Sequence, residues 1–373
     1  MKIGIKKIIV LLCFVTFSMN TFGQSENIIR SDSLDLMIGQ MILIGIGDRT
    51  IVEKKDSLLW DIKHGKIGGV ILFEKNINKK NPIQKLKELT NKLQNDVKIP
   101  LFIAIDEEGG KVHRLKEKYG FVGMPSAYSL GMINQYDTTY YYNDILSKEL
   151  YEFGINVNFA PSVDLAINPN NEVLYKTNRC YSHDPAIVTQ HAIACIDAHK
   201  QNNIITVLKH FPGHGSSTAD SHFGMVNVEA GWTLKEVYPF NNIIEMGKCD
   251  AVMTAHIINK RWDTTQLPAT LSYQVIQQFL RGYIGFRGVV FSDDMQMKAI
   301  SKEYGLEAAL ALGINAGLDV VLFGNNVVAT DRPLQGREIH SIIKKLVYEN
   351  QIPISRIRES YERIIKLKSI FYK

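Results

Sequence analysis

The sequence is poor in cysteine. Four cysteines occur in 373 residues, and one of them, Cys13, lies in an apolar stretch near the N-terminus. The other three (Cys180, Cys195 and Cys249) are far apart, so no paired spacing indicates a zinc site or a disulfide framework. We therefore expect these three to behave as ordinary small apolar residues.

The chain also lacks runs of basic residues and lacks any Pro/Ser-rich or low-complexity stretch. The formal net charge is +5 at pH 7, and it falls to +2 without the three lysines of the first 23 residues. Binding to nucleic acid depends on clustered Lys and Arg, so we expect no nucleic-acid partner. The missing linker argues against a division into separate domains.

The N-terminal segment has the order of a secretory signal. Lys2, Lys6 and Lys7 precede the apolar run IIVLLCFVTF, and small and polar residues follow around TFGQSEN. The apolar run is too short to favour a permanent membrane span. We predict that residues 1–23 are a signal peptide cleaved near Gly23, that no membrane span remains, and that the protein is exported, with the periplasm as its expected location.

Apolar, β-branched runs recur along the rest of the chain. They are continuous rather than alternating, which is typical of parallel strands covered by helices. The eight runs are 37–46, 68–73, 100–106, 155–164, 204–211, 250–257, 288–294 and 318–323. Helical stretches lie between them, at 83–96, 138–154, 187–202, 273–285 and 305–317, and a basic amphipathic one follows Pro353. This order predicts the α/β class and a single (β/α)8 TIM-type barrel over residues 24–373.

Polar residues stand at the carboxyl ends of five of these runs. They are Asp106, Asp164, Lys209 with His210, His256 and Asp293. Each of them alone could cap a helix or be a satisfied core histidine. In a (β/α)8 barrel, however, the carboxyl ends of the strands face the active site. Five such positions on five strands therefore predict a shared site.

The stretch KHFPGHGSSTADSHFG (209–224) raises the alternative of a metal site. His210, His214 and His222 lie in a glycine-rich loop, without the Cys or Glu partners and the stiff spacing of zinc ligands. We expect no metal. The stretch is better interpreted as one wall of an active site, in which the lysine and histidine donate hydrogen bonds to the substrate.

Six segments together resemble glycoside hydrolase family 3. They are IAIDEEGGKVHRL, NVNFAPSVD, KHFPGHGSSTADSHFG, VMTAHI, LPATLS and FRGVVFSDDM. The resemblance extends over about residues 35–325 and is closest to the β-N-acetylhexosaminidase branch, which is best known for bacterial cell-wall recycling. It implies a barrel without metal or organic cofactor. It also leads us to expect no room for the second α/β domain that many members carry.

The resemblance implies the catalytic residues. The family's nucleophile maps to Asp293 in FSDDM, where a carboxylate forms a covalent glycosyl-enzyme intermediate and the reaction proceeds with retention. Asp294 ranks second, because pleating should turn it the other way. The acid/base dyad of this branch maps to His222 with Asp220. An imidazole titrates near neutral pH, and a nearby carboxylate stabilises its protonated form.

The resemblance also implies the residues that bind the sugar. Asp106 corresponds to the acceptor for the 4- and 6-hydroxyls, and Arg114 completes a charge-assisted clamp. Lys209 and His210 correspond to donors to other hydroxyls. Arg179 corresponds to an arginine in an Arg-Ser-Phe-like triplet, although the two residues that follow it differ here.

These assignments predict a retaining exo-β-N-acetylglucosaminidase that acts on a small glycan or muropeptide, such as a peptidoglycan fragment. The D-S-H motif favours an N-acetylamino sugar, since relatives acting on plain glucosides generally lack it. A β-glucosidase, a phosphorylase of the same family and a catalytically inactive glycan-binding protein remain alternatives. The adjacent Glu107 and Glu108 leave a further possibility, in which the substrate's own acetamide attacks.

Overall fold

The computed structural model describes residues 31–95, 97–220, 224–326 and 333–372. The chain divides after Leu34, and the fold described below is that of the unit Asp35–Lys373. The predicted signal peptide lies outside the described residues. None of the helices within the described ranges has the length and apolar content needed to cross a bilayer.

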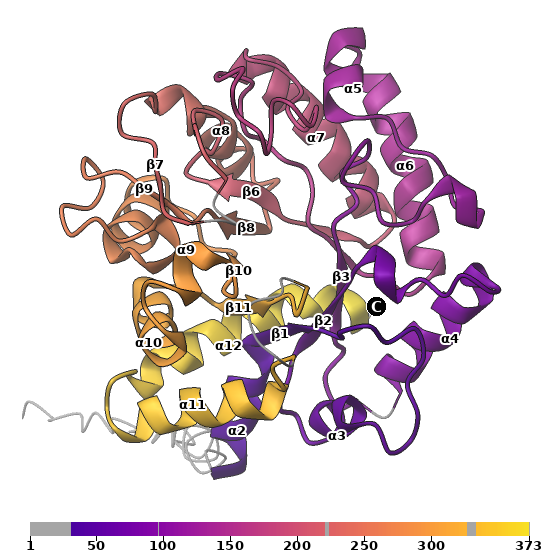
Figure 1. Cartoon of the computed structure of the whole chain (residues 1–373), viewed down its shortest axis with the longest axis vertical. Coiled ribbons are helices and arrows are strands. Elements are labelled where there is room, and N and C mark those ends of the chain that lie inside the picture. Colours follow the sequence, from indigo (N-terminus) through magenta and orange to yellow (C-terminus); the bar gives the residue numbers. More distant parts are fainter. Residues whose placement is uncertain (1–30, 96, 221–223, 327–332, 373) are drawn as a thin grey trace, which may run out of the picture. The chain divides into compact units, whose positions relative to one another are not determined.

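A parallel sheet of short strands forms the centre of this unit (Figure 1). The strand order is β5-β4-β3-β2-β1-β11-β10-β8-β6, and each neighbouring pair is parallel. The strands are β1 (Ile42–Gly45), β2 (Gly69–Leu72), β3 (Phe102–Ile105), β4 (Val157–Asn158), β5 (Ile205–Thr206), β6 (Leu208–Phe211), β8 (Ala251–Thr254), β10 (Val289–Asp294) and β11 (Val320–Phe323). A separate small sheet pairs β7 (Val226–Asn227) with β9 (Ile257–Ile258).

The large sheet closes on itself through one stretch of chain. Strands β5 and β6 stand at opposite ends of the strand order, yet only Val207 separates them in sequence. The segment after β4 pairs with β6 as well, because the Val163 N–H donates to the Lys209 carbonyl at 2.8 Å and Ser162 bridges to Lys209. The predicted (β/α)8 barrel is therefore confirmed, with its fifth strand in two pieces.

Helices cover the outside of the barrel. Figure 1 shows α4, α6 and α7 on one side of the sheet and α10, α11 and α12 on the other. The α-helices are α2 (Ser31–Gln40), α3 (Ser57–Lys63), α4 (Pro82–Gln94), α5 (Ala127–Ile133), α6 (Tyr136–Glu152), α7 (Pro185–Gln201), α8 (Tyr238–Glu245), α9 (Lys298–Ser301), α10 (Leu306–Ala316), α11 (Gly336–Tyr348) and α12 (Ile354–Lys368). A π-helix spans Gln274–Tyr283, and short 3₁₀ turns span Glu74–Asn76, Glu117–Tyr119, Leu234–Glu236, Ala269–Leu271 and Ser369–Tyr372.

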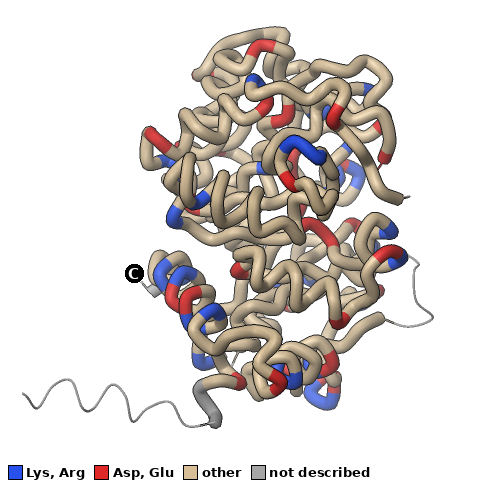
Figure 2. Tube along the Cα trace, turned by 90° about the vertical axis from the view of Figure 1, so that its left-hand side faces the viewer, with Lys and Arg blue, Asp and Glu red and all other residues tan. Residues whose placement is uncertain are grey.

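Local chemistry sets the ends of these helices. Helix α7 begins where the Asp184 side chain accepts a hydrogen bond from the Ala186 N–H at 2.8 Å and Pro185 fills the first position. Helix α10 ends at Gly317, whose φ of 118° is a conformation that favours glycine. Basic and acidic residues are interspersed along the Cα trace (Figure 2), and the last helix, α12, contains both kinds.

The first predicted strand is wrong in its first half. We expected a strand over 37–46, but residues up to Gln40 belong to α2 and the strand covers only Ile42–Gly45. Met37 and Ile38 of this helix are buried. A continuous apolar run cannot by itself distinguish a buried helix from a buried strand, which explains the error.

A lysine is buried at the amino-terminal ends of β2 and β3. The Lys368 side chain is 0% exposed, and its ammonium donates to the Gly68 carbonyl and to Gln40 Oε1, both at 2.7 Å. The same ammonium lies 4.3 Å from the centre of the Phe102 ring. Burial holds the pKa of Lys368 well below its usual value. Lys368 thus attaches the last turn of α12 to the base of the barrel.

Candidate active site

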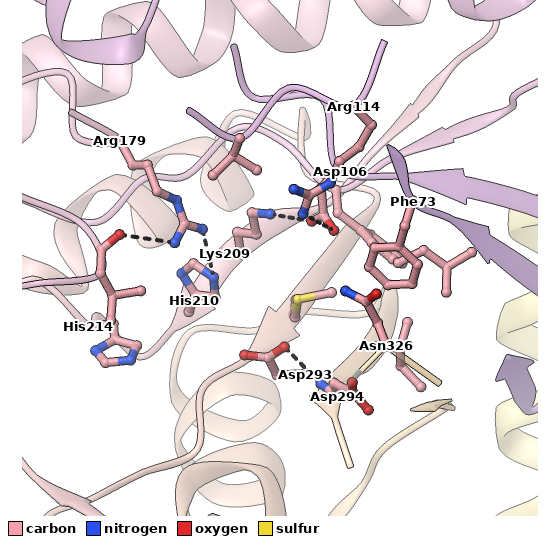
Figure 3. A pocket seen from close by; sticks show the side chains of 16 residues that line it. Phe73, Asp106, Arg114, Arg179, Lys209, His210, His214, Asp293, Asp294 and Asn326 are labelled. Atoms are coloured by element: carbon pink, nitrogen blue, oxygen red, sulfur yellow. Dashed lines mark hydrogen bonds and ion pairs between the residues drawn. The ribbon is translucent and has the colours of Figure 1, made fainter. Parts of the chain in front are cut away.

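A cavity of about 230 Å³ opens at the carboxyl ends of the barrel strands. Six of the predicted site residues line it, and they come from segments that follow β3 and β4 and from the strands β6 and β10 (Figure 3). These six are Asp106, Arg114, Arg179, Lys209, His210 and Asp293. Asp106, Lys209, His210 and Asp293 belong to the strand-end pattern and do meet in space, whereas Asp164 and His256 of that pattern are not among the residues that line the cavity.

Lys209 lies between two carboxylates. Its ammonium is 2.8 Å from Asp106 Oδ1 and 2.6 Å from Glu108 Oε1, and the residue is 2% exposed. Burial works to raise the pKa of Asp106, but Lys209 and Arg114 outweigh it and hold that pKa below its usual value. Burial likewise opposes the charge on Lys209, and the two carboxylates nevertheless raise its pKa. Asp106 and Lys209 are therefore both charged at neutral pH.

Glu108 also holds Arg179. Two parallel hydrogen bonds of 2.8 Å join the Arg179 guanidinium to the Glu108 carboxylate. Burial favours the neutral acid, yet Arg179 and Lys209 lower the pKa of Glu108 far below its usual range. Glu108 therefore orients two cations of the cavity and has no oxygen to spare for chemistry on a substrate.

Asp164 fixes the start of the glycine-rich stretch. Its Oδ2 lies 2.6 Å from His210 Nδ1, and its Oδ1 accepts a hydrogen bond from the His214 N–H at 2.7 Å. Burial raises the pKa of Asp164, but the two histidines outweigh this and lower it far below the usual range. Because Nδ1 of His210 is bonded to Asp164, its Nε2 is the nitrogen that lies beside Arg179, at 3.5 Å.

The two aspartates at the end of β10 have different surroundings. Asp293 faces the cavity, across from Asp106 and Arg114 (Figure 3), and its Oδ1 accepts a hydrogen bond from the Asp294 N–H at 2.7 Å. Asp294 Oδ1 instead accepts the N–H groups of Gln296 and Gly324, both at 3.0 Å. Asp294 therefore holds the backbone together at the ends of β10 and β11.

His256 supports the same strand end. One ring nitrogen lies 2.9 Å from the carbonyl oxygen of Asp294, and the other lies 2.8 Å from Thr270 Oγ1. The residue is 0% exposed. His256 therefore acts on the position of the β10 terminus and is not among the residues that line the cavity.

Of the predicted acid/base dyad, only Asp220 lies within the described residues. Asp220 is partly exposed and does not line the cavity. His222 lies outside the described residues, so the pairing of these two side chains stays a prediction. Within the described ranges, no group of three or more His, Cys, Asp or Glu residues is arranged to hold a metal ion.

Sequence reasoning assigned no role to several other residues of the cavity. Phe73 follows β2, and Asn326 follows β11. His214 belongs to the stretch considered for metal binding, and burial lowers its pKa to about 4, so the ring is neutral at pH 7. The one signal in the sequence for Phe73 and Asn326 is that each follows the end of a strand. That signal does not show that they reach the cavity, because the paths of the loops determine this.

The fold and the site together define a class of protein: a (β/α)8 barrel with a polar, charge-paired cavity at the carboxyl ends of its strands. Such a cavity suits a ligand rich in hydroxyl groups. The chain matches the model of the glycosyl hydrolase family 3 N terminal domain over residues 33–367, and it belongs to this family. The resemblance seen in the sequence is thereby confirmed.

Relatives of known name agree with this membership. The chain is 33% identical over 324 residues to Beta-hexosaminidase A of Pseudoalteromonas piscicida, and the match covers 81% of this chain and 53% of that protein. This chain therefore spans about half the length of that relative. It is 30% identical over 350 residues to the Beta-hexosaminidase of Actinobacillus pleuropneumoniae serotype 3, covering 88% of this chain and 97% of that protein.

Solved structures show the same fold. A glycoside hydrolase family 3 beta-N-acetylglucosaminidase from Paenibacillus sp. str. FPU-7 superposes with a TM-score of 0.82 at 32% identity, over 90% of this chain and 62% of the other. A Beta-N-acetylhexosaminidase from Beutenbergia cavernae has a TM-score of 0.77 at 24% identity, over 90% of this chain and 98% of the other. The second likeness bears on the fold alone.

Proposed function

We propose that the protein is a retaining exo-β-N-acetylhexosaminidase that removes terminal N-acetylglucosamine. The observation that carries the proposal is the position of Asp293, which faces the cavity across from the charged group of Asp106, Arg114 and Lys209. The names of the relatives, hexosaminidases and N-acetylglucosaminidases of this family, support the choice of sugar.

In the proposed reaction, Asp293 attacks the anomeric carbon of the bound sugar. The bond from that carbon to the leaving oxygen breaks, the oxygen takes a proton from His222, and a glycosyl ester forms on Asp293. Water then attacks the same carbon while His222 accepts its proton, and the ester bond to Asp293 breaks. Two displacements at one carbon give retention of configuration.

The charged group would hold the sugar during both steps. Asp106 is kept ionised by Lys209 and Arg114, so it accepts hydrogen bonds from sugar hydroxyls. Lys209, Arg179 and His210 have polar atoms beside the same cavity. A ligand without these hydroxyls would displace water from the polar groups without replacing its hydrogen bonds, which costs about 1–3 kcal/mol for each group.

The experiment that tests the mechanism uses Asp293→Ala and an aryl N-acetyl-β-glucosaminide. We expect kcat/KM to fall by about 10³-fold or more, and we expect added azide to restore turnover and to give the α-glycosyl azide. The wild-type enzyme incubated with an activated 5-fluoro N-acetylglucosaminide should carry a label on the peptide that contains Asp293. Wild-type turnover with no labelled peptide, and no azide product from the variant, would instead favour attack by the substrate's acetamide.

Substrate and product analysis tests the rest of the proposal. We propose that the protein is exported and acts on peptidoglycan fragments, which matches the expected signal segment. The aryl glucoside should be a much poorer substrate than its N-acetylamino analogue, and free sugar should remain the product in phosphate buffer. Equal cleavage of both glycosides would indicate a β-glucosidase, and sugar phosphate would indicate a phosphorylase.

A further inference from the structure

Three consecutive acids follow β3, and they point in different directions. Asp106 and Glu108 contact the cations of the cavity, whereas Glu107 is 1% exposed and turns to the opposite side, as the alternation of an extended chain requires. Asn158 holds the backbone of Glu107 on both sides, accepting its N–H and donating to its carbonyl, each at 3.0 Å. The orientation of all three acids is therefore fixed from β4.

The Glu107 carboxylate binds three consecutive residues of the returning chain. Its Oε1 accepts the N–H groups of Arg114 at 2.5 Å and Leu115 at 2.7 Å, and its Oε2 bonds to Nδ1 of His113. His113 is itself buried, with 6% exposure. One carboxylate thus satisfies two backbone donors and a ring nitrogen on the segment that carries Arg114.

The turn at residues 109–112 restricts the path of the segment that carries Arg114. Gly109 and Gly110 have φ values of 92° and 57°, and a Cβ on Gly109 would lie 2.2 Å from the Pro125 carbonyl oxygen. Gly109 and Val112 form an antiparallel bridge across the turn. Beyond this bridge, the side chain of Glu107 provides the anchor for the next three residues.

Arg114 is the residue that this anchor places in the cavity. Its Nη2 lies 3.5 Å from Asp106 Oδ2, and its guanidinium lies 5.8 Å from the centre of the Phe73 ring. Its Nε is buried and has no hydrogen-bond partner among the described residues. A buried donor of this kind indicates a missing acceptor, which an oxygen of a bound ligand would supply.

We infer that Glu107, paired with His113, is a positioning residue that sets Arg114 against Asp106 and so determines how tightly a sugar hydroxyl is held. Glu107 does not touch the substrate in this arrangement; it acts through the His113 ring and the backbone N–H groups of Arg114 and Leu115. The inference rests on the proposed function for the identity of the ligand, but its geometric part, the anchoring of the turn, does not.

The kinetic test compares Glu107→Ala with Glu107→Gln on an aryl N-acetyl-β-glucosaminide and on its 4-deoxy analogue. The alanine variant leaves two buried N–H groups without acceptors, so we expect kcat/KM for the parent sugar to fall about 10- to 100-fold, mainly through KM. Its preference for the parent over the 4-deoxy sugar should largely disappear. The glutamine variant keeps an acceptor oxygen and should stay within about threefold of wild type. His113→Ala should fall between the two.

The matched control is Glu117→Ala, an exposed acid a few residues along the same segment. Glu117→Ala should leave kcat/KM unchanged for both substrates. A residue with a merely structural role would lower activity on the two sugars equally, so an unchanged preference in a folded Glu107→Ala protein overturns the inference. If Glu107→Ala does not fold, His113→Ala decides by the same ratio.

Hydrogen exchange gives a test that needs no substrate. Amide exchange of a peptide that covers residues 109–115 should be at least tenfold faster in Glu107→Ala or His113→Ala than in wild type or Glu117→Ala. Equal exchange in all four proteins overturns the inference. If the wild-type protein cleaves neither sugar, the proposed function is wrong but the inference about Glu107 is not affected. The exchange experiment then still decides the role of Glu107.

Discussion

At the scale of single residues, Lys209 connects Asp106 to Glu108. It is buried, and its ammonium lies within 2.8 Å of Asp106 and 2.6 Å of Glu108. Without this ammonium, the two carboxylates would share one buried region with Arg114 and Arg179 as their remaining cations. Like charges that approach each other in a buried site raise each other's pKa.

We predict that Lys209→Met loses both activity and stability. Removing one partner of a buried ion pair costs about 3–5 kcal/mol, so urea unfolding at pH 7 should show a loss of this size, and kcat/KM should fall about 100-fold or more. Lys148→Met on α6, which breaks an exposed pair with Asp144, should cost under about 1 kcal/mol. Similar losses in the two variants would contradict this role of Lys209.

At the scale of elements, the short 3₁₀ turn Leu234–Glu236 packs against the glycine-rich stretch at Gly213 and Ser216. Glu236 is 0% exposed, and its Oε2 accepts a hydrogen bond from the Ser216 N–H at 3.2 Å. A Cβ on Gly213 would lie 2.4 Å from the Cβ of Glu236, so only glycine fits there. Burial raises the pKa of Glu236 to about 7, and neighbouring Asp164 adds to this.

We predict that Glu236→Gln is more stable than wild type above pH 7. The raised pKa means that the folded protein binds a proton which the unfolded chain has already lost, so the contribution of Glu236 is present at acid pH and lost as pH rises from about 4.5 to 7. The amide mimics the protonated acid, and the gain should reach about 3 kcal/mol. Urea unfolding at pH 5 and pH 8 measures it, with Glu245→Gln on α8 as control. An equal difference at both pH values would contradict the prediction.

The elements also show what the sequence could predict. Continuous apolar runs located the barrel strands, because buried parallel strands need no polar face. The same property hid the end of α2 inside the run 37–46, and it made the strand 155–164 look longer than Val157–Asn158. The stretch 273–285 was predicted to be helical, but the sequence does not reveal the hydrogen-bond offset that makes Gln274–Tyr283 a π-helix.

The site was predictable to the extent that it follows strand ends. Asp106, Lys209 and Asp293 follow that rule and meet in the cavity. Arg114 and Arg179 came from the family resemblance, since both lie on loops. Phe73, His214 and Asn326 had no predicted role, because loop paths depend on packing between distant segments.

At the scale of the whole molecule, stability at acid pH depends on buried neutral histidines. His199 is 0% exposed; its Nδ1 lies 2.9 Å from the Cys195 carbonyl, and its Nε2 lies 3.0 Å from Asn158 Nδ2. Both ring nitrogens of the neutral form are therefore used. Burial lowers the pKa of His199 to about 4, and that of His214 to about 4 as well.

We predict that the protein loses stability between pH 6.5 and pH 4. In this window His199 is protonated in the unfolded chain but stays neutral in the folded protein, so a fall in pH favours unfolding. His199 alone should account for about 3 kcal/mol. His199→Gln should therefore show a smaller difference between urea unfolding at pH 7 and at pH 4.5, whereas the exposed His64→Gln should behave as wild type. An acid loss that is the same in all three proteins would exclude His199 as its source.

Chemical modification of the Lys368 amine can measure how fast the base of the barrel opens. The side chain is fully buried beneath the first strands, so in the folded protein an acylating reagent cannot reach the amine. Modification at this position should therefore proceed only as fast as the last turn of α12 detaches from the barrel base. Pulse acylation read by peptide mass would report that rate directly, without a spectroscopic probe or an engineered label.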